Sequence, residues 1–442
     1  MKVSATDPEG LVRLLEGDLP PDEKRRMIRR MLTTSRAGTG RSTVPRLAAG
    51  PATPADGDIE ELGELRLSGR ALDLLLEQSR VPGLIARLEG RTLTERQHLV
   101  RTDRELQSSA VAHRLIETCH DLLHAEMAKA EELAELAVTL SQELDARRYG
   151  SELVNDIKAR AWACLAEVLR SQADLRNADE ALAVAESLLG QGTGDVLDEA
   201  RLLELKAVLR RDQHRLDEAH AMLDEVVAIY RQYRDFHLVG RAFVQKGSVY
   251  GAASDFEPAV RWLRKGLGLI DPTRERRLDL SARHSLMLYL HESGRNQEAW
   301  FLLKASRPEF LEHGGELLNL RLRWLEGKIQ QALGRPEEAE TALTQARRGF
   351  LDQGAGFSAA LVCLDLAGLY AGQSRAGEVR HLAEEMLPIF HSRDIHREAI
   401  AALIVFQQAV RMEKLSAGLL DEIRVYLRRA RTDPKLRFEY SA

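Results

Sequence analysis

A similar pattern of residues recurs every forty positions through the second half of this chain. Small or medium apolar residues stand at equivalent sites in six successive segments: Ala178, Ala219, Ala259, Ala299, Ala339 and Val379. The steps between them are 41, 40, 40, 40 and 40 residues. A second series, twelve residues earlier, runs Ala166, Ala207, Gly247, Met287, Gly327 and Ala367. A fixed period of this length marks stacked supersecondary units that bury their hydrophobic faces against their neighbours.

Composition indicates that these units are helical. The chain is 44% hydrophobic and 30% charged but only 5% aromatic, a balance that favours amphipathic helices over strands. No segment shows sustained period-two alternation bounded by hairpin turns. The sequence therefore predicts an all-α fold. At 442 residues it exceeds a usual single domain, but a repeat array grows without needing a larger central core.

The repeat resembles the tetratricopeptide (TPR) family. One unit places large and small residues at the positions of that family's pattern: Trp162, Leu165, Ala166, Leu169, Leu175, Ala178, Leu182 and Ala185. A later unit does so with Phe243, Gly247, Tyr250, Phe256, Ala259 and Leu263. The family period is about 34 residues, and longer units like these resemble the helical sensor regions of bacterial transcription regulators. The resemblance implies a right-handed α-solenoid of stacked antiparallel helix pairs.

Changes in composition predict the domain boundaries. Residues 1–32 read as a small helical module, and residues 33–57, rich in Gly, Pro, Thr and Ala, as a flexible linker. Residues 58–108 form a helical lead-in. The TPR-like solenoid of about eight helix pairs is expected over 109–431, and residues 432–442 are a C-terminal tail.

The N-terminal module carries a second resemblance. Its sequence runs from Leu14 through Gly17-Asp18-Leu19-Pro20-Pro21-Asp22-Glu23 to Arg29-Arg30-Met31-Leu32. This is similar to the zinc-binding anti-sigma-factor domain, a family that has a His before the Leu and then Cys-x-x-Cys. Here Arg30 takes the place of the His, and residues 34–38 supply no cysteine. Because zinc needs thiolate or imidazole ligands, no metal is expected at this site.

Several classes of function are disfavoured. The net charge of −5 gives no support for nucleic-acid binding. No apolar run approaches the ~20 residues that span a bilayer, and the N-terminus has no apolar secretion signal. The three cysteines, Cys119, Cys164 and Cys363, lie far apart in helical patterns and read as reduced core residues. We therefore expect a cytoplasmic bacterial protein without a membrane partner or cofactor.

Histidines raise the one enzymatic alternative. Three Glu-x-x-His pairs occur, Glu95–His98, Glu117–His120 and Glu378–His381, and His113 and His124 share a predicted helical face with the second pair. Di-iron bundles use such pairs together with two further glutamates. The segment around Glu95 is short and flanked by charge, so a solvated or structural histidine face is favoured. No nucleophile motif is present, and a metal-dependent enzyme is the least favoured class.

The candidate binding site is a ladder of arginines. Equivalent positions on successive first helices of the pairs carry Arg160, Arg201, Arg241, Ser281 and Arg321. Ten residues further on, the series is Arg170, Arg211, Gly251, His291 and Gln331. The TPR resemblance implies that these positions face the concave surface. Guanidinium groups bind carboxylates and phosphates through two parallel hydrogen bonds. A cationic groove would thus consist of Arg160, Arg170, Arg201, Arg211, Arg241, His291 and Arg321.

Plainer interpretations of these basic residues stay open. The ladder arginines could be solvated or paired with a neighbouring glutamate such as Glu204 or Glu167. The basic end of the last helix, which carries Arg424 and Arg428, fits the helix dipole, with a docking patch as the alternative.

The sequence favours a non-catalytic scaffold or regulatory adaptor. Its concave groove would bind a protein or an acidic peptide, in bacterial signalling or transcription control. The alternative is a helical-repeat regulator that senses a peptide or a small-molecule ligand.

Overall fold

The computed structural model describes residues 69–123, 126–391 and 417–430. Every regular element in these ranges is a helix, and none of them is long and apolar enough to cross a membrane. The expected N-terminal module (1–32), the linker (33–57) and the tail (432–442) lie outside the described residues, as does the anti-sigma-like motif. The described part of the lead-in holds α3 (Gly69–Ala86) and α4 (Leu93–Thr102).

The chain forms two compact units. The first comprises the residues up to Val168 together with Ala181–Gly194, and the second comprises Leu169–Glu180 and the residues from Asp195 onward. Besides α3 and α4, the first unit contains α5 (Ser109–Leu122), α6 (Met127–Gln142) and α7 (Ala146–Tyr149). Helices α8 (Ser151–Ser171) and α9 (Leu175–Leu189) each contribute to both units.

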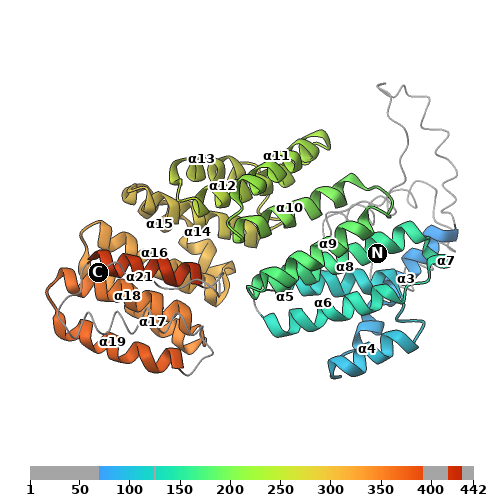
Figure 1. Ribbon diagram of the computed structural model, residues 1–442, viewed down its shortest axis with the longest axis horizontal. Coiled ribbons are helices and arrows are strands. Elements are labelled where there is room, and N and C mark those ends of the chain that lie inside the picture. Colours follow the sequence, from blue (N-terminus) through green and yellow to red (C-terminus); the bar gives the residue numbers. More distant parts are fainter. Residues whose placement is uncertain (1–68, 124–125, 392–416, 431–442) are drawn as a thin grey trace, which may run out of the picture. The chain divides into compact units, whose positions relative to one another are not determined.

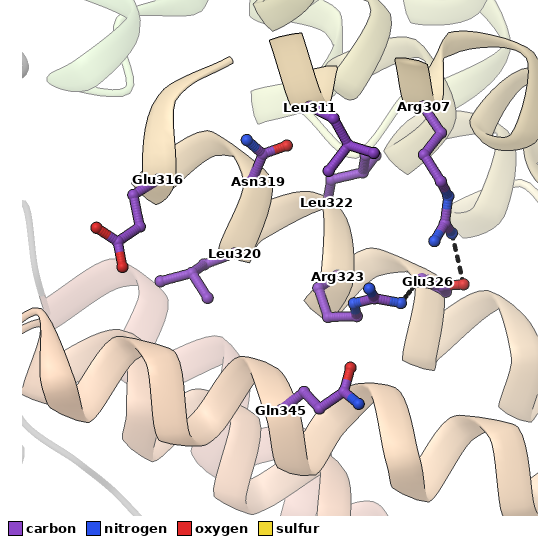
Figure 2. Close-up of a pocket in the computed structure, with 9 residues that line it drawn as sticks. All are labelled: Arg307, Leu311, Glu316, Asn319, Leu320, Leu322, Arg323, Glu326 and Gln345. Carbon is purple, nitrogen blue, oxygen red and sulfur yellow. Dashed lines mark hydrogen bonds and ion pairs between the residues drawn. The ribbon is translucent and has the colours of Figure 1, made fainter. Parts of the chain in front are cut away.

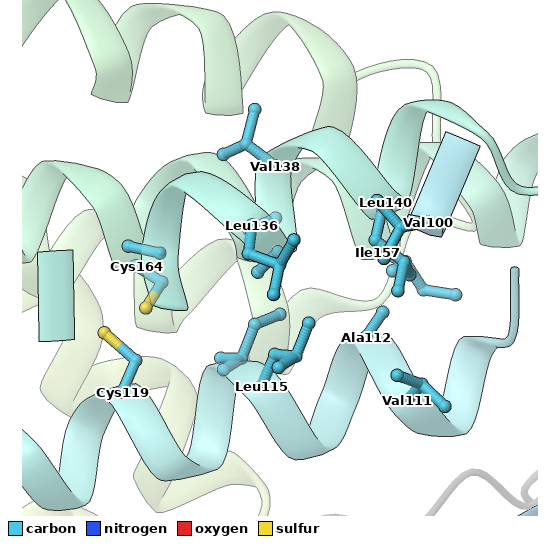
Figure 3. Close-up of a cluster of buried hydrophobic side chains, with 14 of the residues drawn as sticks. Val100, Val111, Ala112, Leu115, Cys119, Leu136, Val138, Leu140, Ile157 and Cys164 are labelled. Atoms are coloured by element: carbon cyan, nitrogen blue, oxygen red, sulfur yellow. The ribbon is translucent and has the colours of Figure 1, made fainter. Parts of the chain in front are cut away.

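The core of the first unit lies between α5, α6 and α8. Leu115, Leu136, Leu140 and Ile157 are almost completely buried there (Figure 3). Figure 3 also shows Cys119 and Cys164 in this core, and both thiols are free. A hydrogen bond with Cys119 and then burial raise the pKa of Cys164, so this sulfur is held as a neutral thiol.

The second unit is a tandem series of helix pairs (Figure 1). The pairs are α10/α11 (Val196–Asp212, Leu216–Gln232), α12/α13 (Phe236–Ala252, Phe256–Leu267), α14/α15 (Arg276–Glu292, Asn296–His313), α16/α17 (Gly315–Ala332, Pro336–Asp352) and α18/α19 (Gly356–Gly372, Ala376–His391). Each helix packs against its pair partner, and each second helix packs against the first helix of the next pair. A further helix, α21 (Ala417–Ala430), contacts α18.

The two small-residue series form the contact within each pair. Ala219, Ala259, Ala299 and Ala339 are all fully buried. Opposite them, a Cβ atom on Gly247 would lie 2.8 Å from Leu263 Cγ, and one on Gly327 would lie 2.6 Å from Leu343 Cγ. These distances leave no room for a side chain without a shift of the neighbour. The small residues at these sites therefore allow the paired helices to approach closely.

One kind of turn repeats along the second unit and sets the period. His214, Arg234, Ser254, Gly294, Gly334, Gly354 and Ser374 all have positive φ. The residue that directly follows each positive-φ residue donates its N–H to the carbonyl five positions before it. Arg215 donates to Arg210 in this way (2.8 Å), and Arg295 donates to Leu290 (2.8 Å). This is the Schellman arrangement that ends helices. Because the turns recur at about twenty residues, two of them give one forty-residue unit.

The first helices of the second unit lie on the inner side of its curve. Contacts between next-but-one helices join α10 to α12, α12 to α14, α14 to α16 and α16 to α18. In the part of the chain that the structure describes, successive second helices make no contacts of similar extent. Since elements approach one another on the inside of a bend, the first helices line that side.

Candidate binding face on the first helices

Side chains on the first helices of the second unit reach from one helix to the next. Arg241 of α12 donates to Glu204 of α10 (2.8 Å), and Lys328 of α16 donates to Glu292 of α14 (2.8 Å). Trp324 of α16 donates through its indole N–H to Asp365 of α18 (2.6 Å). We use the term inner face for the first-helix surface that carries these bridging residues and the ladder positions Arg201, Arg211, His291 and Arg321.

Glu204 is the most buried charged group of the inner face. It is 2% exposed and accepts hydrogen bonds from Arg241 and from the Tyr230 hydroxyl (3.1 Å). Arg201 approaches the same carboxylate oxygen, Oε2, at 3.5 Å. Arg241 also donates to Glu275 (3.1 Å), so one guanidinium group joins two carboxylates. The result is a network in which every charged group has an opposite charge beside it.

Electrostatics holds this network in its ionised form. Burial opposes the charge of Arg241, but Glu204, Tyr230 and Glu275 outweigh it and raise the pKa of the guanidinium. Burial likewise acts to raise the pKa of Glu275, yet Arg241 and Arg201 outweigh it, so that this pKa is lowered. For Tyr230, burial and then Glu204 raise the pKa to about 12, which keeps the phenol protonated.

A second carboxylate, Asp212, is bracketed by two ladder arginines. Arg170 donates to one oxygen (2.8 Å), and Arg211 donates through Nε and one Nη to the other (2.9 and 2.7 Å). Burial acts to raise the pKa of Asp212, but Arg211 and Arg170 outweigh it and lower it. The bracket therefore carries a net charge of about +1. The buried Nε of Arg170 has no acceptor among the described residues.

The second ladder positions of α12 and α14, Gly251 and His291, carry no charge. Gly251 lies beneath the ring of Tyr289, and a Cβ atom there would come within 2.2 Å of the ring. His291 makes a hydrogen bond through Nδ1 to Asn296 (2.6 Å), and burial, with Lys328 next, lowers its pKa. His291 is therefore neutral at pH 7. It offers a ring nitrogen rather than a positive charge to the inner face.

Arg160 and Arg321 belong neither to the network around Glu204 nor to the bracket around Asp212. Arg160 belongs to the first unit, where its guanidinium lies 2.9 Å from Nε2 of His113. Arg321 has an exposed side chain at the predicted position of α16, and its backbone bonds to His284. The second unit thus brings together Arg170, Arg201, Arg211, Arg241, His291 and Arg321 on connected helices.

The acidic half of the inner face was not predicted from the sequence. Arg201 does approach Glu204, as the plainer interpretation suggested, whereas Glu167 pairs with His120 instead (3.2 Å). Asp212 and Glu275 were not anticipated. Asp212 directly follows Arg211 in the sequence, which was the available signal.

The described residues of the predicted histidine face, which include His113 and His120, do not come together as metal ligands. His113 contacts Arg160, His120 contacts Glu167, and His124 lies outside the described residues. Over residues 69–123, 126–391 and 417–430, no three His, Cys, Asp or Glu side chains cluster as metal ligands would. Glu378 pairs with Arg375 (3.0 Å), and His381 lies near Glu385 (3.3 Å).

Comparisons with known proteins identify the fold. No family model matches the chain, and no curated protein matches it. Among solved structures, a Rap protein complexed with Competence and Sporulation Factor is similar at a TM-score of 0.53 with 12% identity, over 73% of this chain and 88% of that chain. The apo form of RapI gives 0.51 with 14% identity, over 72% and 86%.

A third similar structure is a signal transduction ATPase (STAND protein) with a tetratricopeptide repeat sensor from Pyrococcus horikoshii. Its TM-score is 0.55 with 14% identity, over 86% of this chain and 55% of that one. At such identities the likeness concerns the fold alone. Together with the stacked helix pairs, it confirms the predicted all-α, TPR-like helical-repeat fold.

Proposed function

We propose that this chain is a non-catalytic adaptor that holds an acidic segment of a partner protein against its inner face. The observation that carries the proposal is the bracket in which Arg170 and Arg211 flank the one carboxylate of Asp212. In this bracket one positive charge is left over, and guanidinium N–H groups remain unused. A guanidinium has five N–H donors, of which Arg170 uses one and Arg211 two on Asp212.

The bracket around Asp212 also orients its two arginines before a partner binds. Long side chains lose rotamer freedom on binding, at a cost of about 0.5–1.5 kcal/mol each. Asp212 already fixes Arg170 and Arg211, whose side chains are 18% and 21% exposed. An incoming carboxylate would therefore meet donors that are in place and still reachable from solvent.

Burial separates two roles among the arginines. Arg241 is only 12% exposed and holds Glu204 and Glu275, so we assign it to positioning. Arg201 is 28% exposed, and Arg321 is exposed, so we assign these two to partner contact together with Arg211.

The similar structures are consistent with this assignment. The Rap protein was solved in complex with Competence and Sporulation Factor, and the archaeal protein carries its tetratricopeptide repeats as a sensor. We extend the proposal to a regulatory adaptor in bacterial signalling or transcription control, located in the cytoplasm, with residues 1–32 as a tethered module.

A titration with defined peptides tests the proposal. Fluorescent synthetic peptides rich in Asp and Glu should bind the wild type, and peptides with Lys in their place should not. The double variant Arg201→Ala, Arg211→Ala should weaken binding by about tenfold or more, since each lost charged hydrogen bond costs about 1.5–3 kcal/mol. Added salt should also weaken it.

The matched control is Arg176→Ala. Arg176 is 88% exposed on α9 and pairs only with its neighbour Glu180 over the described contacts. If the acidic peptides bind the double variant as well as the wild type, the inner face is not the binding site.

One observation favours a small-ligand sensor as a second candidate. A cavity of about 710 Å³ opens in the first unit, lined by Arg80, Arg104, Arg148 and the buried Glu77. Sites for small molecules are commonly about 300–1,000 Å³. Glu77 accepts hydrogen bonds from Tyr149 (2.7 Å) and Arg148 (3.1 Å), which leaves the outer arginines to face an anionic ligand. Thermal unfolding with a panel of small organic anions tests this, and no shift with any of them would reject it.

A further inference from the structure

A second candidate surface lies on the other side of α16. A cavity of about 220 Å³ opens between α15, α16 and α17. The cavity is lined from α16 by residues such as Asn319, Arg323 and Glu326. An α-helix makes one turn every 3.6 residues, so these three side chains lie on the side of α16 opposite to Arg321 and Lys328. The cavity therefore belongs to a surface distinct from the inner face.

The local sequence explains why the helices leave this gap. Pro308 lies inside α15, where it has no N–H to give to the carbonyl of Lys304. In addition, α15 runs to His313 and α16 begins at Gly315, whose φ is +67°, so the usual three-residue turn is missing here. The chain therefore departs from the regular repeat at the end of α15, beside this cavity.

Apolar side chains line part of the cavity and are exposed on the helix beside it. Leu311, Leu320 and Leu322 line the cavity. Leu311 is 68% exposed, and Phe301, about three turns earlier on α15, is 69% exposed. With the exposed Pro308 between them, these residues form a strip along one side of α15. Large apolar side chains gathered on a surface mark an interaction site more often than scattered ones do.

Polar side chains lie at both ends of the cavity. Figure 2 shows Glu316 at one end and Arg307, Arg323 and Glu326 at the other. Arg307 and Arg323 each donate to a different oxygen of Glu326 (2.5 and 2.7 Å), which leaves the other N–H groups of both guanidiniums unused. Near the opposite end, the buried Oδ1 of Asn319 has no donor among the described residues.

We propose that this cavity and the α15 strip bind a segment of another protein that carries a large apolar residue next to an acidic one. The apolar side chain fills the cavity between Leu320 and Leu322. The carboxylate takes the free donors of Arg307 and Arg323, and a backbone N–H of the segment reaches Asn319. Small-molecule sites are usually larger, at about 300–1,000 Å³, so a single anchoring side chain fits this volume better.

The test uses the full chain and labelled synthetic peptides. Each peptide carries one Leu or Phe beside one Asp or Glu in a Gly/Ser background. Matched peptides carry Ala in place of the apolar residue or Lys in place of the acid. Fluorescence anisotropy should show binding of the first set, and each replacement should weaken it by about tenfold or more, the equivalent of about 1.4 kcal/mol.

Two variants remove the surface by different means. Gln345→Trp fills the cavity from α17, and Leu311→Asp places a charge on the strip. Both should abolish binding, whereas Thr344→Trp, an exposed position next to Gln345, and Phe236→Asp, an exposed apolar residue at the start of α12, should not. Thermal unfolding of all four checks that they fold.

Three results would overturn the proposal. Peptide binding that survives both Gln345→Trp and Leu311→Asp places the site elsewhere, and a failure of every peptide to bind removes it. Self-association that Leu311→Asp abolishes, without peptide binding, assigns the surface to a second copy of the chain. The inner-face variant Arg201→Ala should leave this binding unchanged, so the proposed function and this inference can fail independently.

Discussion

The inner face of α10 and α12 differs sharply from that of α18, although both are built from equivalent repeat positions. Glu204 of α10 and Leu364 of α18 stand four repeats apart at the same site. Around Glu204 the face is a network of arginines, carboxylates and a tyrosine that still reaches solvent at Arg201. Around Leu364 the face is covered, because α21 packs against α18.

The contacts of α21 show how a helix can be held on this face. Arg424 donates to the carbonyl of Leu364 (3.1 Å) and pairs with Asp365 (3.0 Å). Leu420 and Ile423 are buried alongside. Gly368 makes room, since a Cβ atom there would lie 2.9 Å from the Arg424 guanidinium. The comparison teaches that α18 is covered by a helix of the same chain, whereas Arg201 of α10 stays reachable from solvent, as the proposed function requires.

The largest expected effect concerns the buried network. Arg241→Ala should lower the free energy of unfolding by about 3–5 kcal/mol, because it leaves Glu204 buried with its main partner gone. Replacing both residues by Met should restore most of this loss. Urea unfolding measures both variants. A loss below about 1 kcal/mol for Arg241→Ala would show that the network is not buried as described.

His284 occupies the same repeat position between these two regions. Burial, with Arg321 and Lys328 of α16 adding to it, lowers its pKa from 6.5 to about 4. The unfolded chain therefore binds a proton that the folded chain does not. Stability should be constant above pH 6.5 and fall by an amount on the order of 3 kcal/mol as the pH drops toward 4.

A variant separates this contribution from other acid effects. His284→Leu should flatten the decrease between pH 6.5 and 5, measured by thermal unfolding over a pH series. An equally steep decrease in the variant would assign the pH dependence to other groups.

The contact of α21 should be weaker than the buried network. Arg424→Ala should cost about 2 kcal/mol, since Asp365 loses a charged hydrogen bond but keeps that of Trp324. Hydrogen exchange should show faster opening of α21 and unchanged protection of α10. If α10 opens equally, the two regions are coupled more tightly than the contacts indicate.

The smallest effect on stability is expected at the proposed contact position. Arg201→Ala should cost less than about 1 kcal/mol, because Arg201 is 28% exposed and Glu204 keeps Arg241. The same change should weaken acidic-peptide binding. A stability loss as large as that of Arg241→Ala would make Arg201 a structural residue and contradict the assigned roles.

The fold could be predicted from the sequence because spacing alone encodes it. The buried alanines and the close-packed Gly247 and Gly327 repeat at a period that only stacked helix pairs explain. The electrostatics could not be predicted in the same way. The partner of Arg170 is Asp212, forty-two residues later, and nothing in the local sequence indicates that pairing. The neutral state of His291 likewise depends on burial, which appears only in three dimensions.

The cavity beside α15 was equally hidden. Pro308 and the pair Gly314–Gly315 are visible in the sequence, but each is common in helical proteins. The structure adds that α15 continues to His313 and α16 begins at Gly315, so the regular turn is absent beside the cavity. Sequence patterns report regular features well, and this site arises from a departure from the regular turn.

The recurrent twenty-residue turn has an evolutionary consequence. Because a residue in the left-handed region ends one helix after another, neighbouring helix pairs are connected by turns of similar geometry. A lineage could then duplicate or delete one pair while the remaining pairs kept their internal packing. Recognition could likewise change one repeat at a time, because the equivalent position of different repeats already carries Glu204, His284 or Leu364.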